Sequence, residues 1–471
     1  MPSVDEARSL REYLLNDEAS QKVFDRLEAM VSGAISRKLQ EPNHPPSLSL
    51  QDEPWLMQIT EQAGQKLIQD QLTENLPADK LADLVTQVML DKHPLGPLMP
   101  LLRDKRVQNV HVNGPRDCFY FIDGVRYYAR LSFKDAEDVR LRVIDYFNSQ
   151  SKSAKISQAN PIGTIILPTG ERVHVAMGLG EPDPVITLRK HQPDRFANFS
   201  KLHVDGKAMP EYCVGFLKAV VIAKLNVLFC GGVNAGKTTW LRAFGQAVPH
   251  DERLGVIEDD RELFLRELRE KTDTFEESSR AENTEGKGGI KMDVLIREAL
   301  RQNANRMIVG EVRGKEALYM LKAMSSGWNG SACTIHADEA EDVLPQLMGY
   351  VFEHEDAPRN EAQVEKKISR AIHLIVFLAK HRNPEGIERR VLDKIVAVYG
   401  YGGDGILTQE LVAYDELRET WHWVGPRLTD AGNDRWRRRF RNSGIDLASL
   451  IPQEVYIEGR KYMEDENERE Y

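Results

Sequence analysis

The chain has 471 residues, of which 41% are hydrophobic, and its formal net charge is −10. This length and apolar content allow a large core shared among roughly two to four domains, and the negative charge argues against attraction of the whole chain to nucleic acid or anionic lipid. The four cysteines are far apart and form no Cys-x-x-Cys pair, so neither a disulfide framework nor a thiolate zinc site is indicated, and a reducing cytosol is favoured.

Residues 1–95 are predicted to form an N-terminal helical region, because apolar residues recur there at three- and four-residue spacing. A proline-rich linker at 41–54 interrupts these helices and is expected to be extended. The region lacks the basic and apolar parts of a signal peptide. The longest apolar run of the chain, Cys213–Cys230, is broken by lysines and an asparagine, so any membrane contact is expected to be peripheral.

Residues 96–191 are predicted to form a small α/β domain, because short β-rich runs alternate with turn sequences. One helix is expected at about 136–149. The polar segment 192–200, which contains Pro193, is the predicted hinge to the next domain. The expected strands are Asn109–Asn113, Cys118–Ile122, Thr164–Leu167, Val173–Met177 and Val185–Arg189.

Residues 201–402 alternate strand and helix patterns, which is typical of a doubly wound, parallel α/β sheet. The charged segment 266–289 has too few apolar residues for a core position and is expected to be a surface loop beside the site. Residues 403–471 are expected to be a C-terminal tail with a basic cluster at 435–441. The expected strands are 226–230, 253–258, 306–310 and 332–336, with helices at 237–248, 292–302 and 315–326 and a closing hairpin of 373–380 with 391–401.

A phosphate-binding loop is predicted between the first of these strands and the first helix. Gly231, Gly236, Lys237 and Thr238 fit the G-x-x-x-x-G-K-[ST] spacing. Backbone N–H groups of such a loop wrap phosphates, the lysine reaches the outer phosphates and the hydroxyl of Thr238 holds Mg²⁺. The predicted nucleotide-binding residues are Gly231, Gly232, Val233, Asn234, Ala235, Gly236, Lys237, Thr238 and Thr239.

Acidic residues and a histidine follow the other strands of this domain. Glu311 ends an apolar strand and is predicted to orient the attacking water, although a salt-bridged structural glutamate is the alternative. The cluster Glu258-Asp259-Asp260, with Glu262 close behind, suits the surroundings of a metal ion or else a solvated loop. His336 ends a further strand, where a satisfied polar group is commoner than a catalytic one.

Together these segments resemble a known family. Residues 231–239, 256–263, 306–314 and 330–337 are similar to the Walker A, Asp box, Walker B and His box of the type II/type IV secretion ATPase superfamily. His93–Leu102, Val107–Pro115 and Phe440–Leu447 resemble its CpaF-like branch, which drives Tad (Flp) pilus assembly. The resemblance covers roughly residues 75–450 and leaves the first 70 or so unexplained.

The resemblance implies a RecA-like ATPase domain that binds ATP and Mg²⁺, preceded by a small PAS-like domain that closes over the nucleotide. It implies catalytic roles for Glu311, Glu262 and His336, and Mg²⁺ held by Thr238, with Asp259 and Glu311 acting through water. Arg172 and Arg189 match arginines that reach the γ-phosphate, and Arg301 matches one on the helix before Walker B. From composition alone each of these arginines would be a solvated surface residue.

The resemblance also implies a homohexamer on the cytoplasmic face of the inner membrane, acting on platform proteins of a pilus or secretion system. A conjugative type IV secretion ATPase and a nucleotide-gated scaffold with little hydrolysis are the alternatives. A nucleic-acid motor is the least favoured, because the chain is acidic, and no nucleic-acid partner is expected. The basic cluster Arg435–Arg441 suits anionic lipid or nucleic acid, but a basic helix that is solvated or paired with the acidic tail Glu464–Glu470 is the favoured interpretation.

Overall fold

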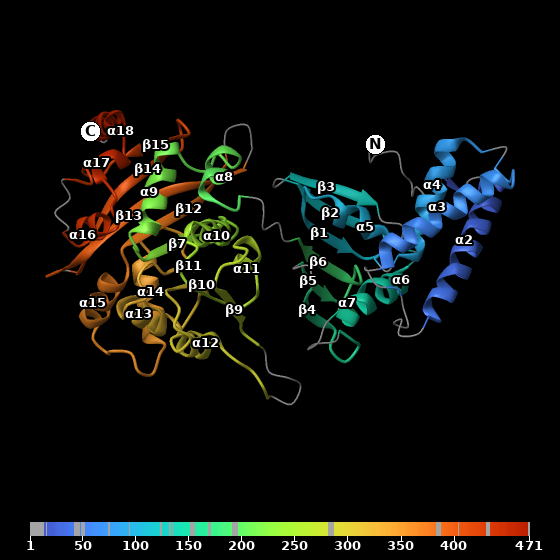
Figure 1. The fold of residues 1–471 in the computed structure, drawn as a ribbon, viewed down its shortest axis with the longest axis horizontal. Coiled ribbons are helices and arrows are strands. Elements are labelled where there is room, and N and C mark those ends of the chain that lie inside the picture. Colours follow the sequence, from blue (N-terminus) through green and yellow to red (C-terminus); the bar gives the residue numbers. More distant parts are fainter. Residues whose placement is uncertain are drawn as a thin grey trace. The chain divides into compact units, whose positions relative to one another are not determined.

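The computed structural model describes residues 14–15, 17–41, 48, 52–73, 76–93, 95–122, 125–130, 133, 135–150, 156–167, 171–190, 196–280, 287–382, 388–403, 405–429 and 434–469. The chain forms two compact units, Met1–Gln192 and Pro193–Tyr471 (Figure 1). Most of the predicted linker and the start of the predicted hinge lie outside the described residues.

Three amphipathic helices open the first unit: α2 (Glu18–Leu39), α3 (Glu53–Gln69) and α4 (Ala78–Lys92). Their apolar faces form one core that includes Phe24, Leu27, Leu56 and Leu84, as the three- and four-residue spacing predicts. The end of the predicted linker differs from the expectation, because Pro54 lies in the first turn of α3. Proline is well tolerated there, since the first helical N–H groups have no partner within the helix.

The rest of the first unit is a six-stranded antiparallel sheet with the strand order β3-β2-β1-β6-β5-β4. The segments α6, η4 and α7 pack on one face of it through Val139, Val143 and Phe147. The third strand, β3, was not expected from the sequence. The elements are η3 (Gly96–Leu98), α5 (Met99–Arg103), β1 (Val107–Asn113), β2 (Asp117–Ile122), β3 (Val125–Arg130), α6 (Ala136–Val139), η4 (Arg140–Ile144), α7 (Asp145–Gln150), β4 (Ile162–Ile166), β5 (Arg172–Ala176) and β6 (Val185–Arg189).

A nine-stranded sheet forms the centre of the second unit, with the order β15-β14-β13-β12-β7-β11-β10-β8-β9. Neighbouring strands from β12 to β9 pair in parallel, and β13, β14 and β15 add antiparallel strands. The predicted α/β fold with a mostly parallel sheet is confirmed. The strands are β7 (Val227–Gly231), β8 (Leu254–Glu258), β9 (Thr274–Ser278), β10 (Arg306–Val312), β11 (Ala332–His336), β12 (Leu374–Arg382), β13 (Glu388–Gly402), β14 (Gly405–Asp415) and β15 (Thr420–Trp423).

Helices cover both faces of this sheet, as a doubly wound fold requires. One core joins the sheet to α8, α9, α10 and α16, and a second joins it to α12, α13, α14 and α15. The helices are α8 (Phe199–Val204), α9 (Glu211–Ile222), α10 (Lys237–Ala247), α11 (Leu265–Leu268), α12 (Met292–Ala299), α13 (Ala317–Ser325), α14 (Val343–Phe352), α15 (Glu361–Ala371), α16 (Asp434–Asn442), α17 (Leu447–Leu450) and α18 (Gln453–Arg469).

Two expectations about this unit are wrong. The charged segment 266–289 is not only a surface loop, because it contains the edge strand β9, which pairs with β8. The residues after 402 are not a separate tail, because β14 and β15 extend the sheet and α16 packs into its core. Trp436 and Phe440 of the basic cluster are buried. Arg439 donates to the carbonyl oxygen of Lys224 at 2.9 Å, so these aromatic residues and this arginine serve to attach α16.

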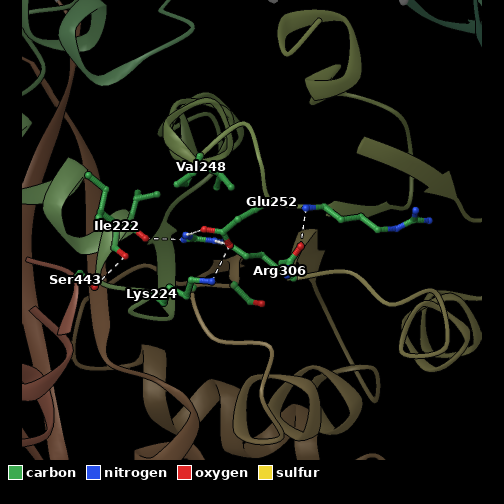
Figure 2. Close-up of polar contacts among 12 residues, drawn as sticks. Ile222, Lys224, Val248, Glu252, Arg306 and Ser443 are labelled. Atoms are coloured by element: carbon green, nitrogen blue, oxygen red, sulfur yellow. Dashed lines mark hydrogen bonds and ion pairs between the residues drawn. The ribbon is translucent and has the colours of Figure 1, made fainter. Parts of the chain in front are cut away.

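A buried ion pair fixes the amino-terminal edge of the sheet (Figure 2). The guanidinium of Arg306, which is fully buried, makes two hydrogen bonds to the carboxylate of Glu252 at 2.8 and 2.7 Å. It donates a third, of 2.6 Å, to the carbonyl oxygen of Val221 at the end of α9. Lys224 lies 3.0 Å from the same carboxylate. The start of β10 is thereby tied to the end of α9 and to the segment before β8.

Candidate functional site

The predicted phosphate loop joins the buried strand β7 to the first residue of α10. Gly231 has φ 144°, and a Cβ there would lie 2.1 Å from the carbonyl oxygen of Leu378 on the neighbouring strand β12. Asn234 and Gly236 also have positive φ, 61° and 98°. This backbone turns N–H groups inward at a helix N-terminus, which is the arrangement that binds phosphate.

Lys237 lies against the loop that it would use to bind phosphate. Its Nζ donates to the carbonyl oxygens of Gly231 and Gly232 at 2.8 and 2.9 Å and lies 3.4 Å from Nδ1 of His336. Burial lowers the pKa of Lys237, and the nearby carboxylate of Glu311 opposes that shift. The lysine, the histidine and the glutamate therefore share one electrostatic site.

Glu311 comes from β10, which lies two strands from β7. The strand continues to Val312, so Glu311 lies within β10. The sequence pattern had instead predicted that Glu311 ends the strand. Its carboxylate is half-buried and pairs with Arg313, whose other terminal nitrogen lies 4.0 Å from Asp259. Arg313 therefore connects the predicted water-orienting acid to the acidic loop after β8.

The acidic loop after β8 brings Glu262 to the phosphate loop. The hydroxyl of Thr238 donates to Oε2 of Glu262 at 3.3 Å. Asp259 instead accepts a hydrogen bond from the hydroxyl of Ser279. These contacts place the predicted Mg²⁺ hydroxyl beside a carboxylate, and oxygen ligands are the ones that Mg²⁺ prefers.

Parallel strands end at one edge of a sheet, and most of the predicted site residues meet at that edge. Lys237, Thr238, Glu262, Glu311 and His336 are all among the residues that meet there. The imidazole Nε2 of this histidine lies 3.7 Å from Asp338. The described residues contain no group of three or more His, Cys, Asp and Glu side chains arranged to hold a metal ion by themselves.

The predicted arginines do not join this cluster within the second unit. Arg301 lies between α12 and the start of β10, at the opposite edge of the sheet, where its exposed guanidinium pairs with Glu298 at 2.6 Å. Arg172 and Arg189 belong to the first unit, where they lie directly opposite each other on β5 and β6 with exposed side chains. The two form a cross-strand pair on the sheet face opposite α6 and α7.

Sequence reasoning missed Arg313, although its nearness to Glu311 could have indicated it. Arg313 lies two residues after Glu311 and directly after the end of β10, so a local ion pair was available to it. The missed partner matters because it neutralises the carboxylate on which hydrolysis would depend.

Comparison with known families matches residues 91–394 to the family described as Type II/IV secretion system protein. The chain belongs to this family. The matched residues include all four motifs at the carboxyl edge of the sheet and also the small antiparallel sheet of the first unit. The matched residues do not include helices α2 and α3. The family resemblance described in the sequence analysis did not extend to these helices either.

Two relatives are similar in sequence to part of this chain. A putative conjugal transfer protein of Mycobacterium tuberculosis is 36% identical over 165 residues, which are 35% of this chain and 44% of that protein. The VirB11 protein of Brucella suis is 26% identical over 309 residues, 61% of this chain and 84% of that protein.

Two solved structures are also similar to parts of the chain. The VirB11 ATPase of the Brucella suis type IV secretion system has a TM-score of 0.34 at 23% identity, with 64% of this chain and 92% of that chain covered. The pilus retraction motor PilT has a TM-score of 0.46 at 17% identity, with 74% of this chain and 86% of that chain covered. No helix among the residues that the structure describes combines the length and apolar character needed to cross a bilayer.

Proposed function

We propose that this secretion-system protein is an ATP hydrolase that works as a homohexameric motor. The observation that carries the proposal is the convergence of Lys237, Thr238, Glu262, Glu311 and His336 at one edge of the sheet. Hydrolysis of a triphosphate requires a cradle for the phosphates, a carboxylate for the water and positive charge for the transition state. This edge supplies all three kinds of group.

The residues of the chain have separate tasks in this scheme. Lys237 leaves the two loop carbonyls and contacts the outer phosphates, while Thr238 and Glu262 face Mg²⁺, which would neutralise charge on the β- and γ-phosphates. Glu311 exchanges its contact with Arg313 for the attacking water. His336, next to the lysine, responds in this proposal to the presence of the γ-phosphate.

The arginines of the first unit complete the motor. Arg172 and Arg189 reach the γ-phosphate when the PAS-like domain closes over the RecA-like domain, and a guanidinium suits that contact through its fixed fork of donors. Arg301, at the far edge of the sheet, acts in this proposal toward a neighbouring copy in the ring. Opening and closing are passed to platform proteins at the cytoplasmic face of the inner membrane, in a CpaF-like machine of the Tad (Flp) type.

A conjugative type IV secretion ATPase is the second candidate. The relative named as a putative conjugal transfer protein is 36% identical over its aligned part, which favours this candidate. Deleting the gene separates the two: loss of surface pili with normal plasmid transfer supports pilus assembly, and the reverse result supports conjugation.

The enzymatic proposal is tested by phosphate release from Mg·ATP. Lys237→Ala should abolish nucleotide binding, and Glu311→Gln should bind ATP without cleaving it. Lys380→Ala and Glu388→Gln, which alter an exposed pair on the β12–β13 hairpin, are matched controls and should keep wild-type turnover. If wild-type protein binds nucleotide but releases phosphate no faster than Glu311→Gln, the protein would instead be a nucleotide-gated scaffold. Mass photometry of the ATP-bound protein tests the sixfold assembly.

A further inference from the structure

Residues 262–269, at and after the end of the acidic loop that follows β8, lie along the whole length of helix α10. At the start of the helix the hydroxyl of Thr238 contacts Glu262. Two turns later Gln246 donates to the carbonyl oxygen of Leu268 at 3.1 Å. At the end of the helix Arg269 donates to the carbonyl oxygen of Gly245 at 2.9 Å. The position of Glu262 is therefore set by a helix that begins in the phosphate loop.

Two buried side chains, Arg242 and Glu258, both hydrogen-bond the backbone of Glu262 and Leu263. Arg242 lies one helical turn after Thr238 and donates to the carbonyl oxygens of Glu262 and Leu263 at 2.6 and 3.0 Å. Glu258, the last residue of β8, accepts from the N–H groups of the same two residues, both at 3.0 Å. The carbonyl groups are thus held from α10 and the N–H groups from the sheet.

We propose that Arg242 and Glu258 are positioning residues, which fix the backbone at Glu262 and so hold its carboxylate beside Thr238, where Mg²⁺ of the nucleotide would bind. This inference rests on the proposed function of the site. Neither side chain needs to touch nucleotide, because each acts through the peptide groups of residues 262 and 263. Both are buried, at 5% and 2% exposure, so neither can move away into solvent without opening the core.

The surroundings of Glu258 show why a glutamate fits this position. Its Cγ lies 3.0 Å from where a Cβ of Gly310 would be, so the glycine provides the space for the side chain next to β10. The second carboxyl oxygen, Oε2, is buried and makes no hydrogen bond to any described residue. Burial raises the pKa of Glu258 to about 8, and the carboxylates of Glu276 and Glu262 act in the same direction.

Oε1 of Glu258 is the single atom that accepts both N–H groups. Glutamine has the same shape and the same acceptor and is neutral, so Glu258→Gln should preserve the clamp. Leucine keeps most of the volume but leaves both N–H groups without an acceptor, so Glu258→Leu should release the loop. Arg242→Met should release it from the other side.

The test is the Mg²⁺ dependence of binding of mant-ATP, a fluorescent ATP analogue, to the full chain. We expect Glu258→Leu and Arg242→Met to raise the Mg²⁺ concentration at half-maximal binding at least fivefold, with binding in EDTA unchanged within twofold. Glu258→Gln should stay within twofold of wild type. Asp415→Leu is the matched control, because Asp415 also accepts two backbone N–H groups at 3.0 Å, in the β14–β15 turn, and its loss should leave the Mg²⁺ midpoint unchanged.

A second readout needs neither metal nor nucleotide. Arg261 lies in the acidic loop and is a trypsin site, so release of the loop should speed cleavage after Arg261 at least fivefold in Glu258→Leu and Arg242→Met but not in Asp415→Leu. Wild-type midpoints and wild-type cleavage in both loop variants would overturn the clamp. Wild-type protein that fails to bind mant-ATP, with or without Mg²⁺, would instead overturn the proposed function, and with it the role of the clamp.

Discussion

The buried ion pair of Arg306 and Glu252 is expected to stabilise the second unit, because each buried charge needs the other to compensate it. Removing one partner of a buried ion pair costs about 3–5 kcal/mol, because the other charge is left without compensation. In Arg306→Met the carboxylate of Glu252 would keep its ion pair with Lys224, which lies 3.0 Å away and is 43% exposed. We therefore expect Arg306→Met to lower the free energy of unfolding by about 3 kcal/mol, at the lower end of this range.

The double variant Arg306→Met/Glu252→Leu should recover most of this loss. Apolar replacement of both partners is close to neutral, so about 1 kcal/mol should remain, from the carbonyl oxygen of Val221 that loses its donor. Five of the six tryptophans lie in the second unit, so their fluorescence in urea follows its unfolding. With a slope of about 3 kcal/mol per molar urea, the single variant should unfold at about 1 M less urea.

The pair of Arg389 and Glu419, 2.7 Å apart on the same unit with side chains 41% and 31% exposed, is far more open to solvent and gives the control. Arg389→Met should change the free energy of unfolding by less than about 0.5 kcal/mol, because exposed pairs contribute little. The reasoning is refuted if Arg306→Met unfolds like this control, or if the double variant is as unstable as the single one. Either result would mean that the burial of the pair does not decide its contribution.

Further outcomes follow from close contacts and from one titrating group. Gly231→Ala should abolish ATP binding, measured by calorimetry, because its Cβ would lie 2.1 Å from the carbonyl oxygen of Leu378. Gly459→Val should detach α18, seen as faster hydrogen exchange of that helix, because a Cβ there would lie 1.8 Å from the carbonyl oxygen of Trp423. Burial raises the pKa of Glu258 from 4.5 to about 8, so between these values the native state binds more protons than the unfolded state. Its contribution to stability is complete below pH 4.5 and is lost as the pH rises to 8, and Glu258→Gln should flatten that part of the melting profile.

The sequence predicted local features of the site well because short-range geometry determines them. The spacing of Gly231, Gly236 and Lys237 specifies a turn and a helix start, and apolar runs before Glu258 and Glu311 specify buried strands. Parallel pairing then forces the ends of these strands to one edge. No long-range information was needed to bring these residues together.

Features that depend on distant partners could not be predicted. The edge strand β9 has an acidic sequence, yet Phe275 pairs with Gly255 on β8, where the absence of a side chain admits its ring. The role of Arg242 is invisible in its helix, because its two acceptors are contributed 20 and 21 residues later. The sheet domain was predicted to end at residue 402, and the extension by β14 was missed because it rests on pairing with β13.

The two edges of the large sheet are held in different ways, and the difference suits the proposed motor. At the amino-terminal edge the contacts are buried: the side chain of Asn226, fully buried, donates to two carbonyl oxygens and accepts two N–H groups. Breaking any of these would leave buried polar groups without partners. At the carboxyl edge Lys237 and Glu311 are half-buried, and each makes contacts that phosphate or water can replace. Nucleotide can therefore rearrange the side chains at one edge while the strands stay in register, because the free-energy cost of moving them is concentrated at the other.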